Sequence, residues 1–227
     1  MLGSMGPRHH ARGGTRCVTV VTDVLEIQGP ATALLDDPLA LRLRGAGPGA
    51  RVLWHARFRD DDGLVWRARA ERAEDLPATW RGKAERAALE SLRPVRIDVR
   101  AETADGRAAT RTIERRIVAD GVRIRRWRDG LRATLHLPAD APAAALVVDG
   151  AAPVQAALLA SRGVLVLTVA SGGLDAARER LAAVPAAAAA GDAVVLGARE
   201  LPLPPGAPGG DRARWAALLA RLLGRHR

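Results

Sequence analysis

The sequence predicts an immunoglobulin-like β-sandwich followed by a smaller three-layer α/β unit. Two observations carry this prediction. Apolar and polar residues alternate with a period of two in several segments of the first half, which indicates strands with one buried face. In the second half, short continuous apolar runs alternate with helical patterns, which is typical of strands buried on both faces. We therefore expect a disordered leader over residues 1–15, the sandwich over 16–128 and the α/β unit over 129–227.

The strands of the predicted sandwich follow from this alternation. Large apolar residues alternate with polar ones around Trp54 and Phe58, and the turn-forming run Asp60–Gly63 leads into the next strand. Gly82–Leu92 does not continue the pattern and is predicted to form a short helix. The predicted strands are Val18–Leu25, Leu39–Arg44, Val52–Arg59, Leu64–Ala70, Val95–Glu102 and Ala108–Ile117.

The α/β unit begins with a predicted hairpin, in which Asp129-Gly130 is the turn between two strands. The apolar runs Ala144–Asp149, Val164–Ala170 and Ala193–Leu196 are predicted strands, and Val154–Ser161 and Leu174–Val184 are predicted helices. The Pro-rich Leu201–Gly210 reads as an extended loop. Asp211 caps a last helix that Gly224 ends, and we expect its apolar face to pack on the sheet. That face consists of Trp215, Leu218, Leu219, Leu222 and Leu223.

The chain is strongly basic, with a formal net charge of +10. Of its 35 basic residues only Lys83 is a lysine, and acidic residues are interspersed among the arginines. This distribution favours a general arginine bias of the coding genome over a nucleic-acid interface, so nucleic acid is not an expected partner. The densest run, Arg123–Arg128, interleaves Trp127 with cations as a phosphate and stacking site would, but its neighbours predict a solvated strand face.

Other bulk features bear on the location of the protein. Cys17 is the single cysteine, which excludes an internal disulfide. The early apolar run Val18–Leu25 is interrupted by Thr22 and Asp23, and no stretch is long and apolar enough for a membrane span. We expect a cytoplasmic protein that does not enter a membrane.

Three segments of the first half resemble a known family. They are LLDDPLALRLRG at 34–45, GPGARV at 47–52 and DDDGLVWRARA at 60–70. In this order they are similar to the N-terminal β-sandwich of the acyl-CoA thioester hydrolases and bile acid-CoA:amino acid N-acyltransferases. The similarity continues through ADGVRIRRWRDGLRATLHLP at 119–138, which resembles the entry into the α/β-hydrolase domain of that family. The resemblance implies acyl-CoA as a substrate and an α/β-hydrolase-like second unit.

A thioesterase of this fold would need a nucleophile elbow, G-x-S-x-G or its cysteine equivalent, between a strand and a helix. No such pentapeptide occurs, and the nearest candidate is AVVLGAREL at 193–201. If this is the elbow strand, Gly197 is the first glycine and Arg199 occupies the nucleophile position. If it is the late strand that leads to the catalytic histidine, Arg199-Glu200 stands where the histidine should be. We favour the second alignment, because the residues that follow resemble the C-terminal tail of the family. The middle of the hydrolase domain is then absent, which leaves a truncated three-layer remnant.

The remaining candidate nucleophiles and bases are poorly placed. Ser171 follows a buried strand in a loop and is a weak candidate, since it lacks the glycine two residues before it. The loop Asp149–Pro153 replaces a glycine-rich oxyanion loop, and Pro153 removes one amide donor. Neither a metal-ligand spacing nor a cofactor motif occurs, so we expect no cofactor. The other residues considered are Cys17 at a strand start, Ser161 at a helix end, His55 and His136 on exposed strand faces, and the terminal His9, His10 and His226.

The sequence thus indicates an acyl-CoA thioester hydrolase or acyltransferase family protein in which catalysis is impaired. The alternative is a non-catalytic binding or interaction module that uses the sandwich. A shortened parallel sheet leaves an exposed edge, so we expect a homo-oligomer or a protein partner there. The product of a degenerate gene is a third possibility.

Overall fold

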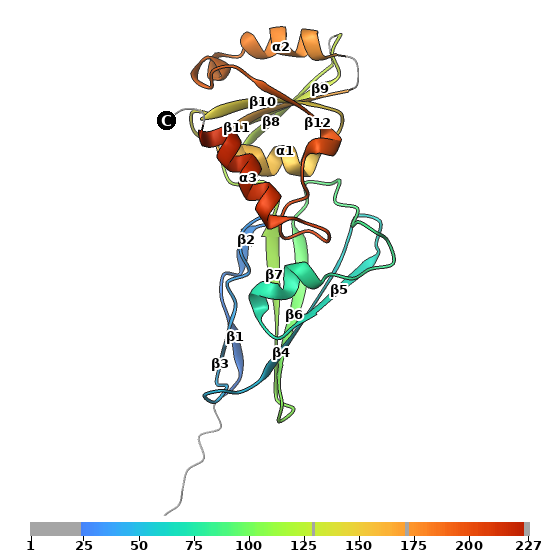
Figure 1. Cartoon of the computed structure of the whole chain (residues 1–227), viewed down its shortest axis with the longest axis vertical. Coiled ribbons are helices and arrows are strands. Elements are labelled where there is room, and N and C mark those ends of the chain that lie inside the picture. Colours follow the sequence, from blue (N-terminus) through green and yellow to red (C-terminus); the bar gives the residue numbers. More distant parts are fainter. Residues whose placement is uncertain (1–23, 129, 171–172, 225–227) are drawn as a thin grey trace, which may run out of the picture.

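The computed structural model describes residues 24–128, 130–170 and 173–224. The molecule is elongated, and its two sheet-containing parts lie one above the other along the long axis (Figure 1). It combines a β-rich part with an α/β part, as expected at that level. The predicted leader and most of the predicted strand Val18–Leu25 fall outside the described residues. So do Ser171 and Cys17, and with them His9, His10 and His226.

The β-rich part contains a five-stranded sheet with the order β2-β7-β6-β4-β5. Its strands are β2 (Thr32–Leu34), β4 (Val52–Arg59), β5 (Val65–Ala70), β6 (Val95–Thr103) and β7 (Ala108–Arg116). β2 runs parallel to β7 and the other pairs are antiparallel. β1 (Glu26–Gln28) and β3 (Arg42–Arg44) form a separate antiparallel pair. The predictions for β4 to β7 are therefore confirmed to within a residue at each end.

One face of this sheet is apolar and covered, as the alternation predicts. Trp54, Phe58 and Trp66 are buried on it, and the 3₁₀ helix η1 (Ala73–Thr79) packs beside β4 and β5. The rings of Phe58 and Trp80 meet edge to face with centroids 4.9 Å apart. The opposite face carries exposed arginines such as Arg57 and Arg100. The strand period thus divides the sheet into a core face and an open polar face.

The predicted helix over Gly82–Leu92 is wrong, since this segment is irregular throughout. Two aspartates of the turn between β4 and β5 accept hydrogen bonds from its backbone instead. Asp60 accepts hydrogen bonds from the Ala88 amide and the Trp66 indole, and Asp61 accepts from the amides of residues 90 and 91. Because these carboxylates satisfy backbone donors at long range, the segment does not need helical hydrogen bonds.

The α/β part contains a second five-stranded sheet with the order β12-β10-β11-β9-β8. β10 runs parallel to both β11 and β12, whereas β9 is antiparallel to β11 and β8. The strands are β8 (Arg123–Trp127), β9 (Ala133–Leu137), β10 (Ala144–Asp149), β11 (Val164–Val169) and β12 (Val194–Gly197). β10 and β11 are buried almost completely, which confirms the interpretation of their apolar runs.

Helices cover both faces of this second sheet (Figure 1). α1 (Pro153–Ser161) and α3 (Arg212–Leu223) lie on the face toward the first sheet. α2 (Leu174–Ala182) and the 3₁₀ helix η2 (Pro185–Ala189) lie on the other face. The Asp211 carboxylate caps α3 by accepting from the Arg214 amide at 3.0 Å, and Trp215, Leu218 and Leu222 are buried. The predicted cap and core face of the last helix are confirmed.

A charged joint links the two parts. The Asp36 side chain is 2% exposed and accepts from Arg162 of the α/β part at 2.8 and 3.0 Å and from the Trp215 indole at 3.0 Å. Asp37 accepts from Arg162 at 2.6 Å. Gly206 lies against the carbonyl oxygen of Leu35, where any Cβ would collide. The Asp-Asp pair therefore fastens the first half of the chain to the second.

Candidate functional site

The sequence places either a nucleophile elbow or the position of the catalytic histidine at the carboxyl end of β12, and a replaced oxyanion loop at the carboxyl end of β10. These two ends are neighbours, since Asp149 pairs in register with Gly197. β12 is the edge strand of its sheet and passes into a single 3₁₀ turn, η3 (Ala198–Glu200), rather than an α-helix. Arg199 and Glu200 are exposed there, and the Glu200 carboxylate accepts from the Gly197 amide.

The backbone at this edge does not have the geometry of an elbow. An elbow places its nucleophile in a strained conformation at a sharp strand-to-helix turn. Among the described residues, every backbone with positive φ belongs to a glycine. Arg199 is therefore an exposed turn residue, and a guanidinium cannot attack a carbonyl carbon.

The described serines have structural hydrogen bonds. Ser161 donates to the Ala157 carbonyl at 2.8 Å and accepts from the Ala119 amide at 2.9 Å, so it joins α1 to the chain that leaves β7. Ser91 donates to Asp61 at 2.7 Å. In the described part of the chain no hydrogen bond joins a serine to a histidine, so the structure brings no nucleophile and base together there.

The expectation that His136 lies on an exposed face is wrong. Its side chain is 1% exposed in β9, where α1 covers that face of the sheet, and neither ring nitrogen has a hydrogen-bond partner among the described residues. Burial lowers the pKa of His136 to about 4. The imidazole is therefore neutral at pH 7 and is shut off from any substrate. His55, in contrast, is half-exposed on the open face of the first sheet, close to what was expected.

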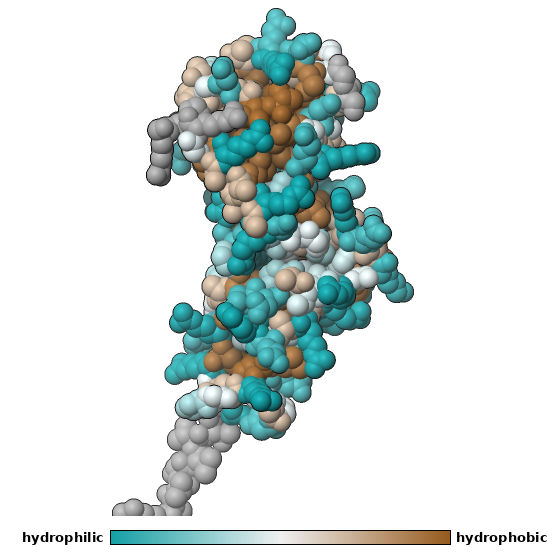
Figure 2. All heavy atoms as spheres, viewed as in Figure 1, coloured by the Kyte–Doolittle hydropathy of each residue, from teal (hydrophilic) through white to brown (hydrophobic). Residues whose placement is uncertain are grey.

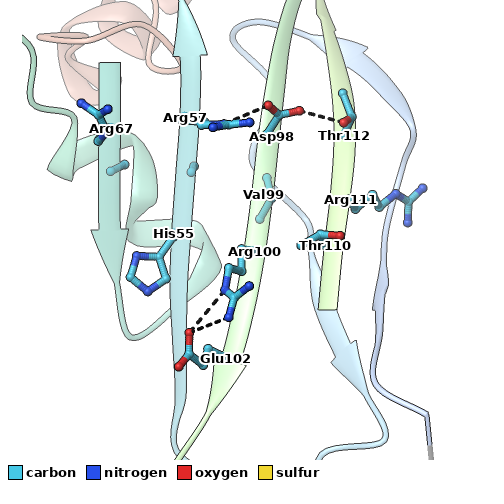
Figure 3. A pocket seen from close by; sticks show the side chains of 12 residues that line it. His55, Arg57, Arg67, Asp98, Val99, Arg100, Glu102, Thr110, Arg111 and Thr112 are labelled. Atoms are coloured by element: carbon cyan, nitrogen blue, oxygen red, sulfur yellow. Dashed lines mark hydrogen bonds and ion pairs between the residues drawn. The ribbon is translucent and has the colours of Figure 1, made fainter. Parts of the chain in front are cut away.

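A broad hollow of about 880 Å³ lies on that open face (Figure 3). Arg57 donates to Asp98 at 3.1 Å, Asp98 also accepts from Thr112 at 2.8 Å, and Arg100 donates to Glu102. The hydrogen bond from Thr112 and the guanidinium of Arg57 lower the pKa of the Asp98 carboxyl. Half of the cations in the hollow are thus neutralised by carboxylates on neighbouring strand positions, which leaves a mixed polar surface.

Polar groups that the sequence did not assign to a site lie at two other places. The buried Oδ1 of Asp149, at the end of β10, has no hydrogen-bond partner among the described residues. Arg126, Arg128 and Arg132 line a second hollow beside the carboxyl ends of β10 and β11. The cation-rich run around Trp127 was the available signal, but its arrangement beside these strand ends depends on tertiary structure.

Among the residues that the structure describes, no three His, Cys, Asp or Glu side chains gather as metal ligands would. In the same residues, no helix has the length and apolar character needed to cross a membrane.

Comparison with known proteins gives one informative similarity. The chain is 29% identical over 204 aligned residues to "Acyl-coenzyme A thioesterase 2, mitochondrial" of Rattus norvegicus, an alignment that covers 73% of this chain and 45% of that relative. No family model matches the chain. The similarity supports a thioesterase-related family. The chain spans less than half the length of this relative, and the relative is named mitochondrial, so the cytoplasmic location stays a prediction.

Proposed function

We propose that this chain is a thioesterase-like protein in which nucleophilic acyl transfer is impaired. The similarity to an acyl-CoA thioesterase supports the ancestry. The observation that carries the proposed impairment is the end of β12, where an exposed turn with Arg199 and Glu200 occupies the place of a nucleophile elbow or of its histidine. His136 supports the same conclusion, because it is buried and neutral and its ring nitrogens have no hydrogen-bond partner among the described residues.

The fold proposed with this function is an immunoglobulin-like sandwich over residues 16–128 and a truncated α/β-hydrolase-like unit over 129–227. The pairing of β1 and β3 beside the five-stranded sheet supports the first. The order β12-β10-β11, with crossover helices on opposite faces, supports the second. β12 pairs with β10 on one side and, among the described residues, with no strand on the other, which supports a sheet shortened at this edge.

The test is incubation of the purified protein with medium-chain and long-chain acyl-CoA while free thiol is monitored. We expect no release above the uncatalysed rate, with a bacterial thioesterase as the positive control. Ser171→Ala should leave the trace unchanged. Turnover that disappears in Ser171→Ala would contradict the proposal, because it would give Ser171 a catalytic role.

The second candidate function is a non-catalytic binding or interaction module. Two surfaces favour it: the open hollow of the first sheet in Figure 3, and the edge of β12, which pairs on one side only. An apolar area is visible on the upper part of the molecule in Figure 2, where β12 lies, and Val194 and Val195 of this strand are half-buried. A second copy pairing along this edge would satisfy its backbone groups.

Size-exclusion chromatography with light scattering tests the interaction module. We expect a dimer, and Val194→Lys should shift it toward monomer because a charge on an edge strand opposes pairing. Ala108→Lys, at an exposed position at the start of β7 and outside both surfaces, is the matched control. A monomeric wild-type protein at high concentration would contradict self-association.

A further inference from the structure

The hollow on the open face of the first sheet (Figure 3) adjoins another hollow of about 670 Å³ on the same sheet. Together they form one depression, which we call the basic groove and which follows β6 from Arg96 to Glu102. At about 3.3 Å for each residue of a strand, this stretch is roughly 20 Å long and accommodates about six residues of an extended chain. The lining residues that the two hollows share are Arg57, Arg67, Asp98 and Thr112.

The basic groove carries an excess of positive charge. Seven arginines line it, against the three acidic residues Asp61, Asp98 and Glu102. Of the residues outside the described ranges, only Asp23 and Asp129 have acidic side chains. Even if both lay beside the groove, the arginines would outnumber the carboxylates. The surface therefore favours a negatively charged partner.

Two arginines of the groove are left to bind such a partner. Arg59 donates only to the carbonyl oxygen of Gly63, and the guanidinium of Arg67 has no hydrogen bond or ion pair among the described residues. Both side chains are exposed. Other arginines of the groove already have acidic neighbours, in the pairs Arg57–Asp98, Arg96–Glu114, Arg100–Glu102 and Arg93–Asp61.

Arg67 also lies between two other arginines. In the register of the sheet it pairs with Arg57 of β4 on one side and with Arg81 on the other. Paired residues project from the same face, and like charges opposite each other lower stability. The alternation of the strand requires a polar residue at this position but not a cation. A local conflict that the fold does not require is expected at functional positions.

The groove favours a polypeptide over nucleic acid. Proteins that bind single strands stack the bases on aromatic side chains, whereas Trp54, Phe58 and Trp66 of this sheet are buried on its covered face. Asp98 lines both hollows and would repel a continuous phosphate backbone. A second copy of this chain is disfavoured as well, because its formal net charge is +10.

We propose that the basic groove docks an acidic segment of another protein in an extended conformation. Carboxylates of the segment pair with the guanidinium groups of Arg59 and Arg67, whose planar donors match a carboxylate well. Every second side chain of an extended segment projects to the same side at intervals of about 6.6 Å, as Arg57 and Arg59 do on β4. Acidic residues at alternate positions therefore fit the groove. This inference rests on the second candidate function and names the partner of the open face.

Fluorescence anisotropy with a labelled peptide tests the two arginines. The probe has alternating glutamate and serine over about twelve residues, which is long enough to fill the groove. We expect it to bind, and Arg59→Gln/Arg67→Gln to weaken binding roughly tenfold, since each exposed ion pair contributes about threefold. The matched control Arg42→Gln/Arg44→Gln removes the same charge from exposed positions of β3 and should bind within about twofold of wild type. Absence of binding, or equal losses in the two variants, would overturn the proposal.

Two further probes identify the class of partner. The same peptide with glutamine in place of glutamate should not bind, and a thymidine oligonucleotide of equal charge should bind more weakly than the glutamate peptide. A glutamine peptide that binds equally well would overturn the role of charge. An oligonucleotide that binds more tightly than the peptide, and that loses affinity in Arg59→Gln/Arg67→Gln, would assign the groove to nucleic acid instead.

Peptide binding can be separated from the other proposals. Val194→Lys, which tests the edge of β12, should leave the affinity for the peptide unchanged, because β12 lies outside the groove. A change in affinity in this variant would contradict the placement of the peptide on the open face. Self-association, peptide binding and release of thiol from acyl-CoA therefore succeed or fail separately.

Discussion

The two five-stranded sheets of this protein are buried in opposite ways. The first sheet, which is mainly antiparallel, has one covered face and one open face that carries arginines and acids, whereas β10 and β11 are enclosed by helices on both faces. Polar side chains of the first sheet can therefore lie anywhere on its open face. In β10 and β11 the polar side chains are confined to the carboxyl ends of the strands, as with Asp149 and Thr168. The extent of burial thus decides at which positions each half of the protein can carry polar functional side chains.

The largest effect should follow from a cavity in the enclosed sheet. Leu167, in the middle of β11, has no exposed surface, so Leu167→Ala should lower the free energy of unfolding by roughly 4 kcal/mol through lost burial and an unfilled cavity. Thr110→Ala on the open face is the control and should change stability by less than about 0.5 kcal/mol. Urea unfolding monitored by circular dichroism measures both. Similar losses in the two variants would break the contrast between the sheets.

Breaking the charged joint between the halves should come next. Asp36→Ala leaves the Trp215 indole without its acceptor and removes two of the three hydrogen bonds from the Arg162 guanidinium to carboxylates, so that Asp37 alone still accepts from it. The expected loss in the free energy of unfolding is about 3 kcal/mol. Asp120→Ala removes an exposed ion pair with Arg116 and serves as control. The measurement is the midpoint of thermal unfolding. If Asp36→Ala lowered the midpoint by no more than Asp120→Ala does, the two halves would be held together by apolar contacts alone.

The pH dependence of the free energy of unfolding should show the contribution of the buried His136. Its pKa of about 4 in the folded protein lies below the value of about 6.5 in an unfolded chain, so between these values the unfolded state binds more protons. The stability that this group contributes is complete well above pH 6.5 and falls as the pH is lowered, with a loss of roughly 2 to 3 kcal/mol near pH 4.5. α1, which covers the ring, contains no charged residue.

The variant His136→Leu isolates this contribution, because leucine does not titrate. Its urea unfolding free energy, measured from pH 7 to 4.5, should decrease less than that of the wild type by the same amount. Parallel pH profiles for the two proteins would show that His136 is already protonated or solvated in the fold.

The smallest effect concerns the open face itself. Arg57 and Asp98 are both more than half exposed, so Arg57→Ala should change the free energy of unfolding by less than about 1 kcal/mol. The change should shrink further in 0.5 M salt, since ions screen exposed pairs. Chemical denaturation at two salt concentrations measures this, and a large, salt-independent loss would mean that the face is covered in solution.

The sequence predicted regular elements well where local pattern and burial agree. The bounds of β4 and β10 were predicted to the residue, and the Asp211 cap of α3 was correct, because period, apolar runs and capping chemistry are local properties. The helix predicted at Gly82–Leu92 failed because Asp60 and Asp61 hold that backbone from another part of the chain. Long-range hydrogen bonds of this kind have no local signature.

The candidate site was less predictable for the same reason. The alternation of residues around His136 predicts which face of β9 its side chain lies on. That this face is also buried depends on the packing of α1 against it, which the local sequence does not indicate. The motif at 34–45 was noticed for its resemblance, yet the partner of Asp36 lies 126 residues further along, at Arg162. Arg126, Arg128 and Arg132 converge because a hairpin folds beside two strand ends.

The loop Leu201–Gly210 reverses a common rule about mutational tolerance. Surface connections usually accept substitutions and insertions more readily than strands do. Here Gly206 touches the Leu35 carbonyl and Gly210 touches that of Pro204, so even alanine would force neighbouring backbone apart at either position. Natural variation should therefore concentrate on exposed strand positions outside the basic groove, while this irregular segment drifts slowly.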